Sequence, residues 1–117
     1  MGSTDLFATF AELAGAVSFA EDSVSLVPTF SNPSLSLRQN VYTEMFSPNG
    51  GTLPFPQHTR AVRDARYKLI RQTGQMDEFY DLAVDPFETN DLFGSLTVEQ
   101  QAAYDDLVAE LVALGVD

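Results

Sequence analysis

Residues 78–92 read EFYDLAVDPFETNDL, and this stretch decides how the chain is interpreted. A short run of strand-forming residues ends at Tyr80-Asp81-Leu82. Asp85-Pro86 then makes a turn, because the residue before a proline is disfavoured in the helical region. We expect four side chains here to cap turns by hydrogen-bonding backbone amides rather than to bind a metal: Asp81, Asp85, Glu88 and Asn90.

Residues 59–72, immediately upstream, predict a β-hairpin. Residues 61–62 form one arm and residues 67–70 form the other, with Asp64-Ala65 at the turn. A type I′ turn needs a positive φ at both central residues, and Ala65 resists that conformation by about 1 kcal/mol. The sequence therefore predicts the hairpin but not that turn type.

Two further strands complete the expected sheet. Residues 36–46 alternate and carry β-formers, and residues 76–80 return after a turn at Thr73-Gly74. Residues 47–57 hold three Pro, two Gly and one Asn, which predicts a loop. Residues 18–36 are rich in Ser, Asn and Pro and predict a second loop.

Two helices are expected. Thr97 and Gln100 form a capping box at the start of a helix over 97–114 that ends at Gly115. Its apolar residues recur at intervals of three and four: Tyr104, Leu107, Val108, Leu111 and Leu114.

An N-terminal helix over 4–16 is capped by Thr4 or Asp5 and ends near Gly15. The whole predicts an α+β fold, in which an antiparallel sheet of three or four strands over 37–82 is packed by the amphipathic C-terminal helix.

Composition argues against several classes of ligand and site. The 117 residues fit one domain, and the net charge of −11 makes nucleic acid an unlikely ligand. No apolar run approaches the roughly 20 residues of a membrane span, so no membrane partner is expected. The absence of cysteine excludes disulfides and a thiol nucleophile.

Charge is divided along the chain. All six Lys and Arg lie between Arg38 and Arg71, while residues 72–117 carry eleven acids and no Lys or Arg. The acidic half is either a solvated surface or folds back on the basic residues of 60–71, and both can hold together.

Four segments resemble sulfatase-family hydrolases. Residues 80–92 resemble a family signature near the C-terminal end of these enzymes, in which Tyr-Asp-Leu is followed by Asp-Pro, Glu and an Asn-rich turn. Residues 63–69 resemble Arg-Asp-Gly-Arg-Tyr-Lys-Leu, with Ala65 in place of Gly. Residues 4–9 and 22–28 resemble two upstream segments in the family's order, with Ala8 in place of Pro and Ser23 in place of Gly.

The resemblance covers residues 4 to about 114 and implies the C-terminal subdomain of such an enzyme, over 4–117. The rest of the catalytic domain is then its partner, and the helix over 4–16 belongs at the edge of that domain. Met1-Gly2-Ser3 is typical of an initiation or cloning remnant.

Sulfatases use a formylglycine made within Cys/Ser-x-Pro-x-Arg, and a divalent cation, usually calcium. Ser31-Asn32-Pro33-Ser34 is a partial match, but Arg38 comes three positions too late. We therefore expect no catalytic residue, metal site or cofactor in this chain. A Ser47-His58-Asp64 triad has no nucleophile elbow to support it.

His58 is the one histidine, and it lies beside the proline-rich loop. It is either a plain loop residue or, as the resemblance implies, a substrate contact together with Arg60 where C-terminal loops shape the pocket.

Two functions stay open: a non-catalytic segment of a sulfuric ester hydrolase that has a structural role and shapes the substrate pocket, or an acidic interaction module. The module would bind a protein partner, or a second copy, through exposed apolar residues such as Leu6, Phe7 and Phe10.

Overall fold

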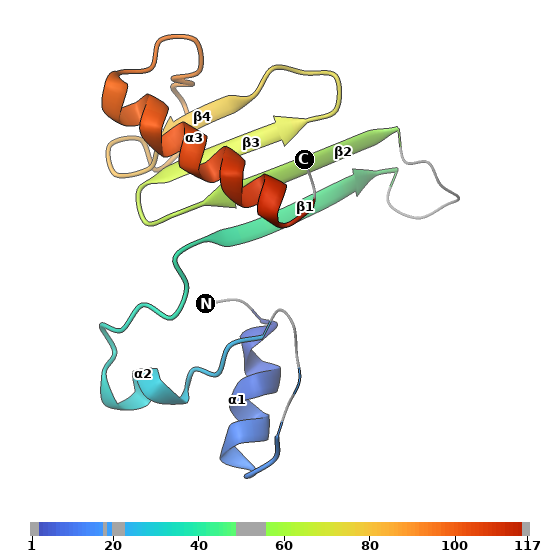
Figure 1. The fold of residues 1–117 in the computed structure, drawn as a ribbon, viewed down its shortest axis with the longest axis vertical. Coiled ribbons are helices and arrows are strands. Elements are labelled where there is room, and N and C mark those ends of the chain that lie inside the picture. Colours follow the sequence, from blue (N-terminus) through green and yellow to red (C-terminus); the bar gives the residue numbers. More distant parts are fainter. Residues whose placement is uncertain (1–2, 18, 20–22, 49–55, 116–117) are drawn as a thin grey trace. The chain divides into compact units, whose positions relative to one another are not determined.

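The structure of the protein is a computed structural model that describes residues 3–17, 19, 23–48 and 56–115 (Figure 1). The chain divides into two compact units, residues 1–38 and 39–117. Expectations for residues 1–2 and for the middle of the loop over 47–57 lie outside the described residues. Among the described residues, no helix has both the length and the apolar character needed to cross a membrane.

The first unit contains α1 (Asp5–Leu13) and α2 (Val27–Ser31). The prediction that Thr4 or Asp5 caps α1 is wrong, because neither side chain makes the capping hydrogen bond. Asp5 is instead buried, and its Oδ1 accepts from the Val24 amide at 3.2 Å and from Arg38 Nη2 at 2.5 Å. Its carboxylate ties the helix to two segments further along the chain.

The short helix α2 falls within the predicted loop over 18–36, so that part of the prediction is wrong. Pro28 stands in its first turn, where a missing amide hydrogen costs nothing and the fixed φ suits a helix. The end of α1 is as expected, since Gly15 has a φ of +69°, which glycine adopts without strain.

The second unit contains a four-stranded antiparallel sheet in the order β1-β2-β3-β4. Its strands are β1 (Val41–Ser47), β2 (Gln57–Arg63), β3 (Tyr67–Gln72) and β4 (Glu78–Asp81). The predicted hairpin is confirmed as β2 and β3, whereas β1 begins at Val41 and not at the predicted residue 36.

The β2–β3 turn shows why the glycine of the family pattern can be replaced. Glu88 is the one non-glycine residue with a positive φ among the described residues, so neither Ala65 nor Arg66 has one and the turn is not type I′. Asp64 Oδ1 accepts from the amides of Arg66 and Tyr67, each at 2.6 Å. A side-chain acceptor therefore closes the turn without left-handed backbone.

Helix α3 (Val98–Ala113) packs across one face of the sheet (Figure 1). The predicted capping box is present, with the Gln100 amide donating to Thr97 Oγ1 and the Thr97 amide donating to Gln100 Oε1. The core joins the helix to β2, β3 and β4 through Val62, Leu69, Phe79, Leu107 and Leu111. Leu114, which was expected on the packed stripe, is exposed because it lies beyond the last helical residue.

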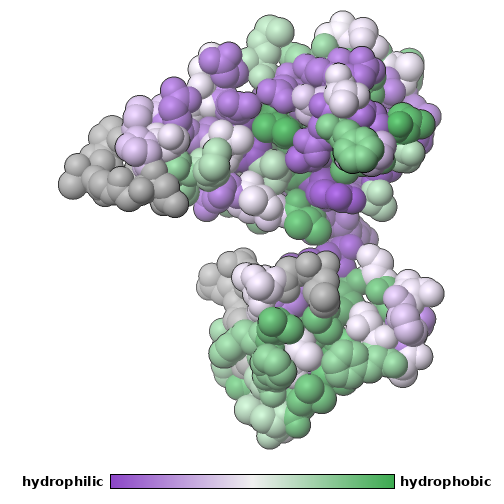
Figure 2. All heavy atoms as spheres, turned by 180° about the vertical axis from the view of Figure 1, so that it is seen from behind, coloured by the Kyte–Doolittle hydropathy of each residue, from purple (hydrophilic) through white to green (hydrophobic). Residues whose placement is uncertain are grey.

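The α+β prediction is confirmed: a four-stranded antiparallel sheet, a C-terminal helix and an N-terminal helix. The apolar residues of α1 remain exposed, including Phe7 at 62% and Phe10 at 64%. Figure 2 shows hydrophobic side chains gathered on the unit that contains α1 and α2.

Candidate functional site

His58 and Arg60 lie two residues apart on β2, so their side chains are on the same face of the sheet as Val62, which packs in the core. His58 Nε2 lies 3.0 Å from Glu44 Oε2 on the neighbouring strand. The imidazole also stacks on Phe46, with 4.3 Å between ring centroids and 12° between planes. The His58 side chain keeps 21% of its surface exposed, so it is held but accessible.

Glu44 lies beside both sequence-predicted residues, because it is opposite Arg60 in the β1–β2 register and its side chain bonds His58. The same carboxylate oxygen accepts from the Tyr42 hydroxyl at 2.9 Å. Burial, together with the hydrogen bond to Glu44, raises the pKa of Tyr42 to about 12, so this phenol stays protonated at neutral pH. The group offers hydrogen bonds and charge for binding.

The Ser47-His58-Asp64 triad does not assemble. His58 is near the start of β2 and Asp64 follows its end, and six residues of strand span about 20 Å. Ser47 instead pairs with Gln57 in the sheet.

The two segments with the most specific family resemblance bind each other. Arg66 Nη2 donates to Asp81 Oδ2 at 2.8 Å, and Arg66 Nε lies 3.1 Å and 3.2 Å from the two Asp81 oxygens. Lys68 Nζ lies 2.7 Å and 2.8 Å from the two Glu88 oxygens. The hydrogen bond from Arg66 holds the pKa of the buried Asp81 carboxyl below its usual value.

Further pairs extend this pattern over the second half of the chain. Arg66 Nη1 also reaches Glu99 at 2.9 Å, at the start of α3. Arg71 Nη2 and the Tyr104 hydroxyl both donate to Asp77 Oδ2 at 2.7 Å. The acidic half therefore does fold back on the basic residues of β3 and the turn before it.

The loop after β4 is held by its acids, as expected for Asp81 and Asp85. Asp85 Oδ2 accepts from the amides of Thr89 and Asn90 at 2.7 Å and 2.8 Å. The expectation for Glu88 is wrong, because its side chain pairs with Lys68. Asn90 takes part as a donor through its backbone amide.

Asp91 has a role that the sequence did not reveal. Its Oδ1 accepts from the amides of Phe79 and Phe93, each at 2.9 Å, and so joins β4 to the loop before α3. The sequence did offer one signal for this role, because Asp91 stands at the end of the Asn-rich turn, where an acid can accept hydrogen bonds from backbone amides.

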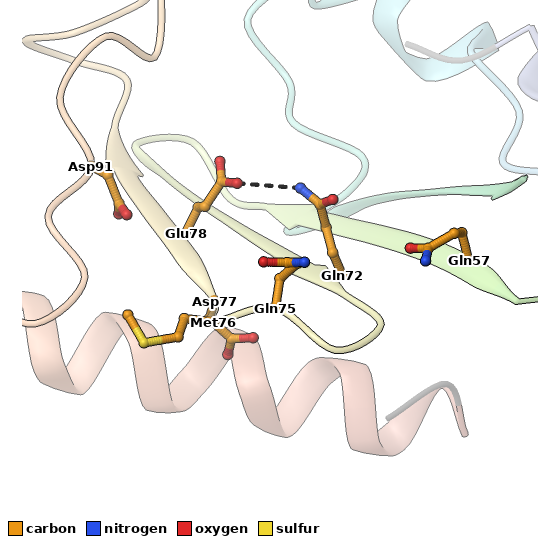
Figure 3. A pocket seen from close by; sticks show the side chains of 7 residues that line it. All are labelled: Gln57, Gln72, Gln75, Met76, Asp77, Glu78 and Asp91. Carbon is orange, nitrogen blue, oxygen red and sulfur yellow. Dashed lines mark hydrogen bonds between the residues drawn. The ribbon is translucent and has the colours of Figure 1, made fainter.

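A pocket of about 430 Å³ lies beside the β3–β4 turn (Figure 3). It was not predicted, because its residues are spread over β2, β3, β4 and the following loop. Glutamines and acids line it together with one methionine: Gln57, Gln72, Gln75, Met76, Asp77, Glu78 and Asp91. Within the described ranges, no three His, Cys, Asp or Glu side chains are grouped as metal ligands.

Residues 1–115 match the family described as N-sulphoglucosamine sulphohydrolase, C-terminal. The chain belongs to this sulfatase C-terminal family. The match spans both structural units and includes all four segments that resemble sulfatases. A comparison with curated proteins gives no match.

Solved structures of sulfatases share the fold of this sulfatase C-terminal chain. BT4656, solved with its substrate D-glucosamine-2-N,6-O-disulfate, superposes with a TM-score of 0.74 over 94% of the chain at 23% identity. A putative sulfatase from Bacteroides thetaiotaomicron gives 0.71 over 93% at 26% identity. BT1596, a 2-O GAG sulfatase, gives 0.66 over 94% at 29% identity. The chain spans 23%, 24% and 22% of these three proteins, respectively.

Proposed function

We propose that this chain is the non-catalytic C-terminal segment of a sulfuric ester hydrolase, and that it supports the catalytic domain and shapes its substrate pocket. The family match over residues 1–115 is the observation that carries the proposal. The sulfatase BT1596 and the substrate-bound BT4656 point to sulfated sugars as the substrate class.

A structural role is supported by ion pairs that join β3 and the turn before it to β4 and the loop after β4. Arg66 and Lys68 are bound by Asp81 and Glu88, so these two cations are already paired within the chain. The formylglycine and the divalent cation, usually calcium, would then come from the rest of the enzyme. The formylglycine would supply the nucleophile, and the divalent cation would supply the charge stabilisation for sulfate ester cleavage.

His58 and Arg60 are our proposed substrate contacts. They are adjacent on one face, at the end of β2 that follows the proline-rich loop. Glu44 bonds His58, lies opposite Arg60 on β1 and is exposed, so an anionic substrate group could replace it as the acceptor for His58 and would then lie beside Arg60.

The first test is the coding region upstream of Thr4, where we expect a Cys/Ser-x-Pro-x-Arg motif and metal-binding aspartates. In the enzyme that contains both parts, His58→Ala and Arg60→Ala should raise KM about tenfold and leave kcat nearly unchanged, as expected for lost binding contacts. Gln101→Ala, on the exposed side of α3, is the matched control. Arylsulfatase turnover by this chain alone, or unchanged KM in both variants, would contradict the proposal.

A second function has one observation in its favour, the exposed apolar side chains of α1. An interaction module would bury Leu6, Phe7 and Phe10 against a partner or a second copy. Light scattering should then report an oligomer that Phe10→Ser dissociates. A monomer at high concentration would remove the support for self-association.

A further inference from the structure

The pocket beside the β3–β4 turn has the size of a small-molecule site. Its volume of about 430 Å³ lies in the range of roughly 300–1,000 Å³ that is typical of ligand pockets. All of its lining residues belong to the unit of residues 39–117 (Figure 3).

Glutamine carboxamides form one part of the lining. The side chains of Gln57 and Gln75 are exposed and form no hydrogen bond with any described residue, whereas Gln72 Nε2 donates to Glu78 Oε1 at 3.2 Å. Each carboxamide offers two donor hydrogens and an acceptor oxygen. This combination suits hydroxyl groups, which both donate and accept.

Carboxylates that are already fixed in position form the other part. Glu78 Oε2 accepts from the Tyr80 hydroxyl at 2.7 Å, and Asp91 Oδ1 is held by two backbone amides. Their remaining lone pairs therefore face a ligand without further ordering, which lowers the entropy cost of binding.

The charge of the pocket selects against anions. Asp77 is neutralised by Arg71 at 2.7 Å. Within the described part of the chain, no Lys or Arg forms an ion pair with Glu78 or Asp91, so the pocket keeps about two negative charges. A sulfate or phosphate group would be repelled, and an ammonium group would be attracted.

We propose that this pocket binds a sugar unit that carries hydroxyls and a free amine but no sulfate. Met76, 76% exposed, offers an apolar surface for the C–H face of the ring. The choice of a sugar over other polyols rests on the proposed function, whereas the preference for a cation follows from the lining alone. The site would thus hold a sulfate-free amino sugar of an oligosaccharide, or the desulfated amine itself.

The test is a titration of the ¹⁵N-labelled chain with glucosamine, glucose and glucose 6-sulfate, followed through the side-chain amide signals of glutamine. Glucosamine should shift the signals of Gln57, Gln72 and Gln75 with a millimolar Kd, and leave Gln101 on α3 unmoved. Binding should weaken about tenfold or more from glucosamine to glucose 6-sulfate, since like charge opposes the latter.

Two variants test whether glucosamine binds in this pocket. Gln57→Ala and Gln75→Ala remove exposed side chains without a folding role, and together they should weaken glucosamine binding about fivefold or more, as expected when several hydrogen bonds are lost. Gln101→Ala should have no effect. The proposal is overturned by the absence of shifts at about 50 mM glucosamine, by equal shifts at Gln101, or by equally tight glucose 6-sulfate binding. A missing sugar site would leave the turnover test of the proposed function unaffected, because the two are measured on different molecules.

Discussion

Replacement of Glu88 tests why an acid stands in the family signature. Its backbone has a φ of 57°, in the left-handed region, and its carboxylate pairs with Lys68. Two effects therefore oppose each other at one residue, because the ion pair favours Glu and the backbone favours Gly.

Their sizes can be compared. A left-handed non-glycine residue costs about 1–2 kcal/mol, and the gain in unfolded-chain entropy makes glycine less favourable by about 0.5–1 kcal/mol. The ion pair joins side chains that are 22% and 31% exposed, so it contributes only about 0.5–1 kcal/mol. Glu88→Ala loses the pair and keeps the strain, and should destabilise the protein by about 1 kcal/mol. Glu88→Gly loses both and should stay within about 0.5 kcal/mol of the parent.

Urea unfolding followed by circular dichroism measures both variants, with Asp106→Ala as a control for loss of an exposed carboxylate. High salt should shrink the difference between parent and Glu88→Ala, since it screens the ion pair, while the difference between the Ala and Gly variants persists. If the Ala variant is as stable as the Gly variant, the backbone strain is not what the reasoning requires.

Three further predictions concern the packed unit of residues 39–117. Leu107→Ala should destabilise it by about 2–5 kcal/mol in urea because Leu107 is fully enclosed in the core, whereas Val112→Ala, at a residue 55% exposed, should cost less than about 1 kcal/mol. Thr97→Ala should lower the unfolding free energy by about 1 kcal/mol through loss of the capping box, and an unchanged melt would contradict that role. The lowered pKa of Asp81 means that its ionised form adds stability above the ordinary Asp value of 3.8, and that this stability is lost as pH falls below it. Asp81→Asn should therefore be less stable than the parent at pH 7 and lose less on acidification, which stability curves at pH 7 and pH 3 will show.

Local signals in the sequence were sufficient for the elements whose chemistry is local. The capping box at Thr97, the glycine after α1 and the β2–β3 hairpin each depend on residues within a few positions of one another. The turn type could be set aside on the same basis, because Ala65 disfavours a positive φ.

Three of the failures have a common physical origin in long-range contacts. Asp5 has the right residue type and place for a helix cap, but its carboxylate is used by Arg38 and the Val24 amide, which lie 33 and 19 residues away. Glu88 likewise bonds Lys68, 20 residues earlier, in place of a nearby amide. The pocket beside the β3–β4 turn was missed for the same reason, since the fold alone brings Gln57, Gln75 and Asp91 to the lining of one pocket.

The segment that resembles the sulfatase signature is thus held by bonds from Asp81 to Arg66, in the turn before β3, and from Glu88 to Lys68 on β3. These bonds affect how this unit can interact with sulfate. Three of the six cations, Arg66, Lys68 and Arg71, are paired with carboxylates inside the packed unit. Residues 39–117 contain five Lys or Arg and thirteen Asp or Glu, so this unit keeps an excess of negative charge and long-range attraction of a sulfate ester to it is unfavourable. On β2, our proposed place for an anionic group is at His58 and Arg60, next to Glu44, while the proposed ligand of the glutamine-lined pocket is the sulfate-free part of the same sugar.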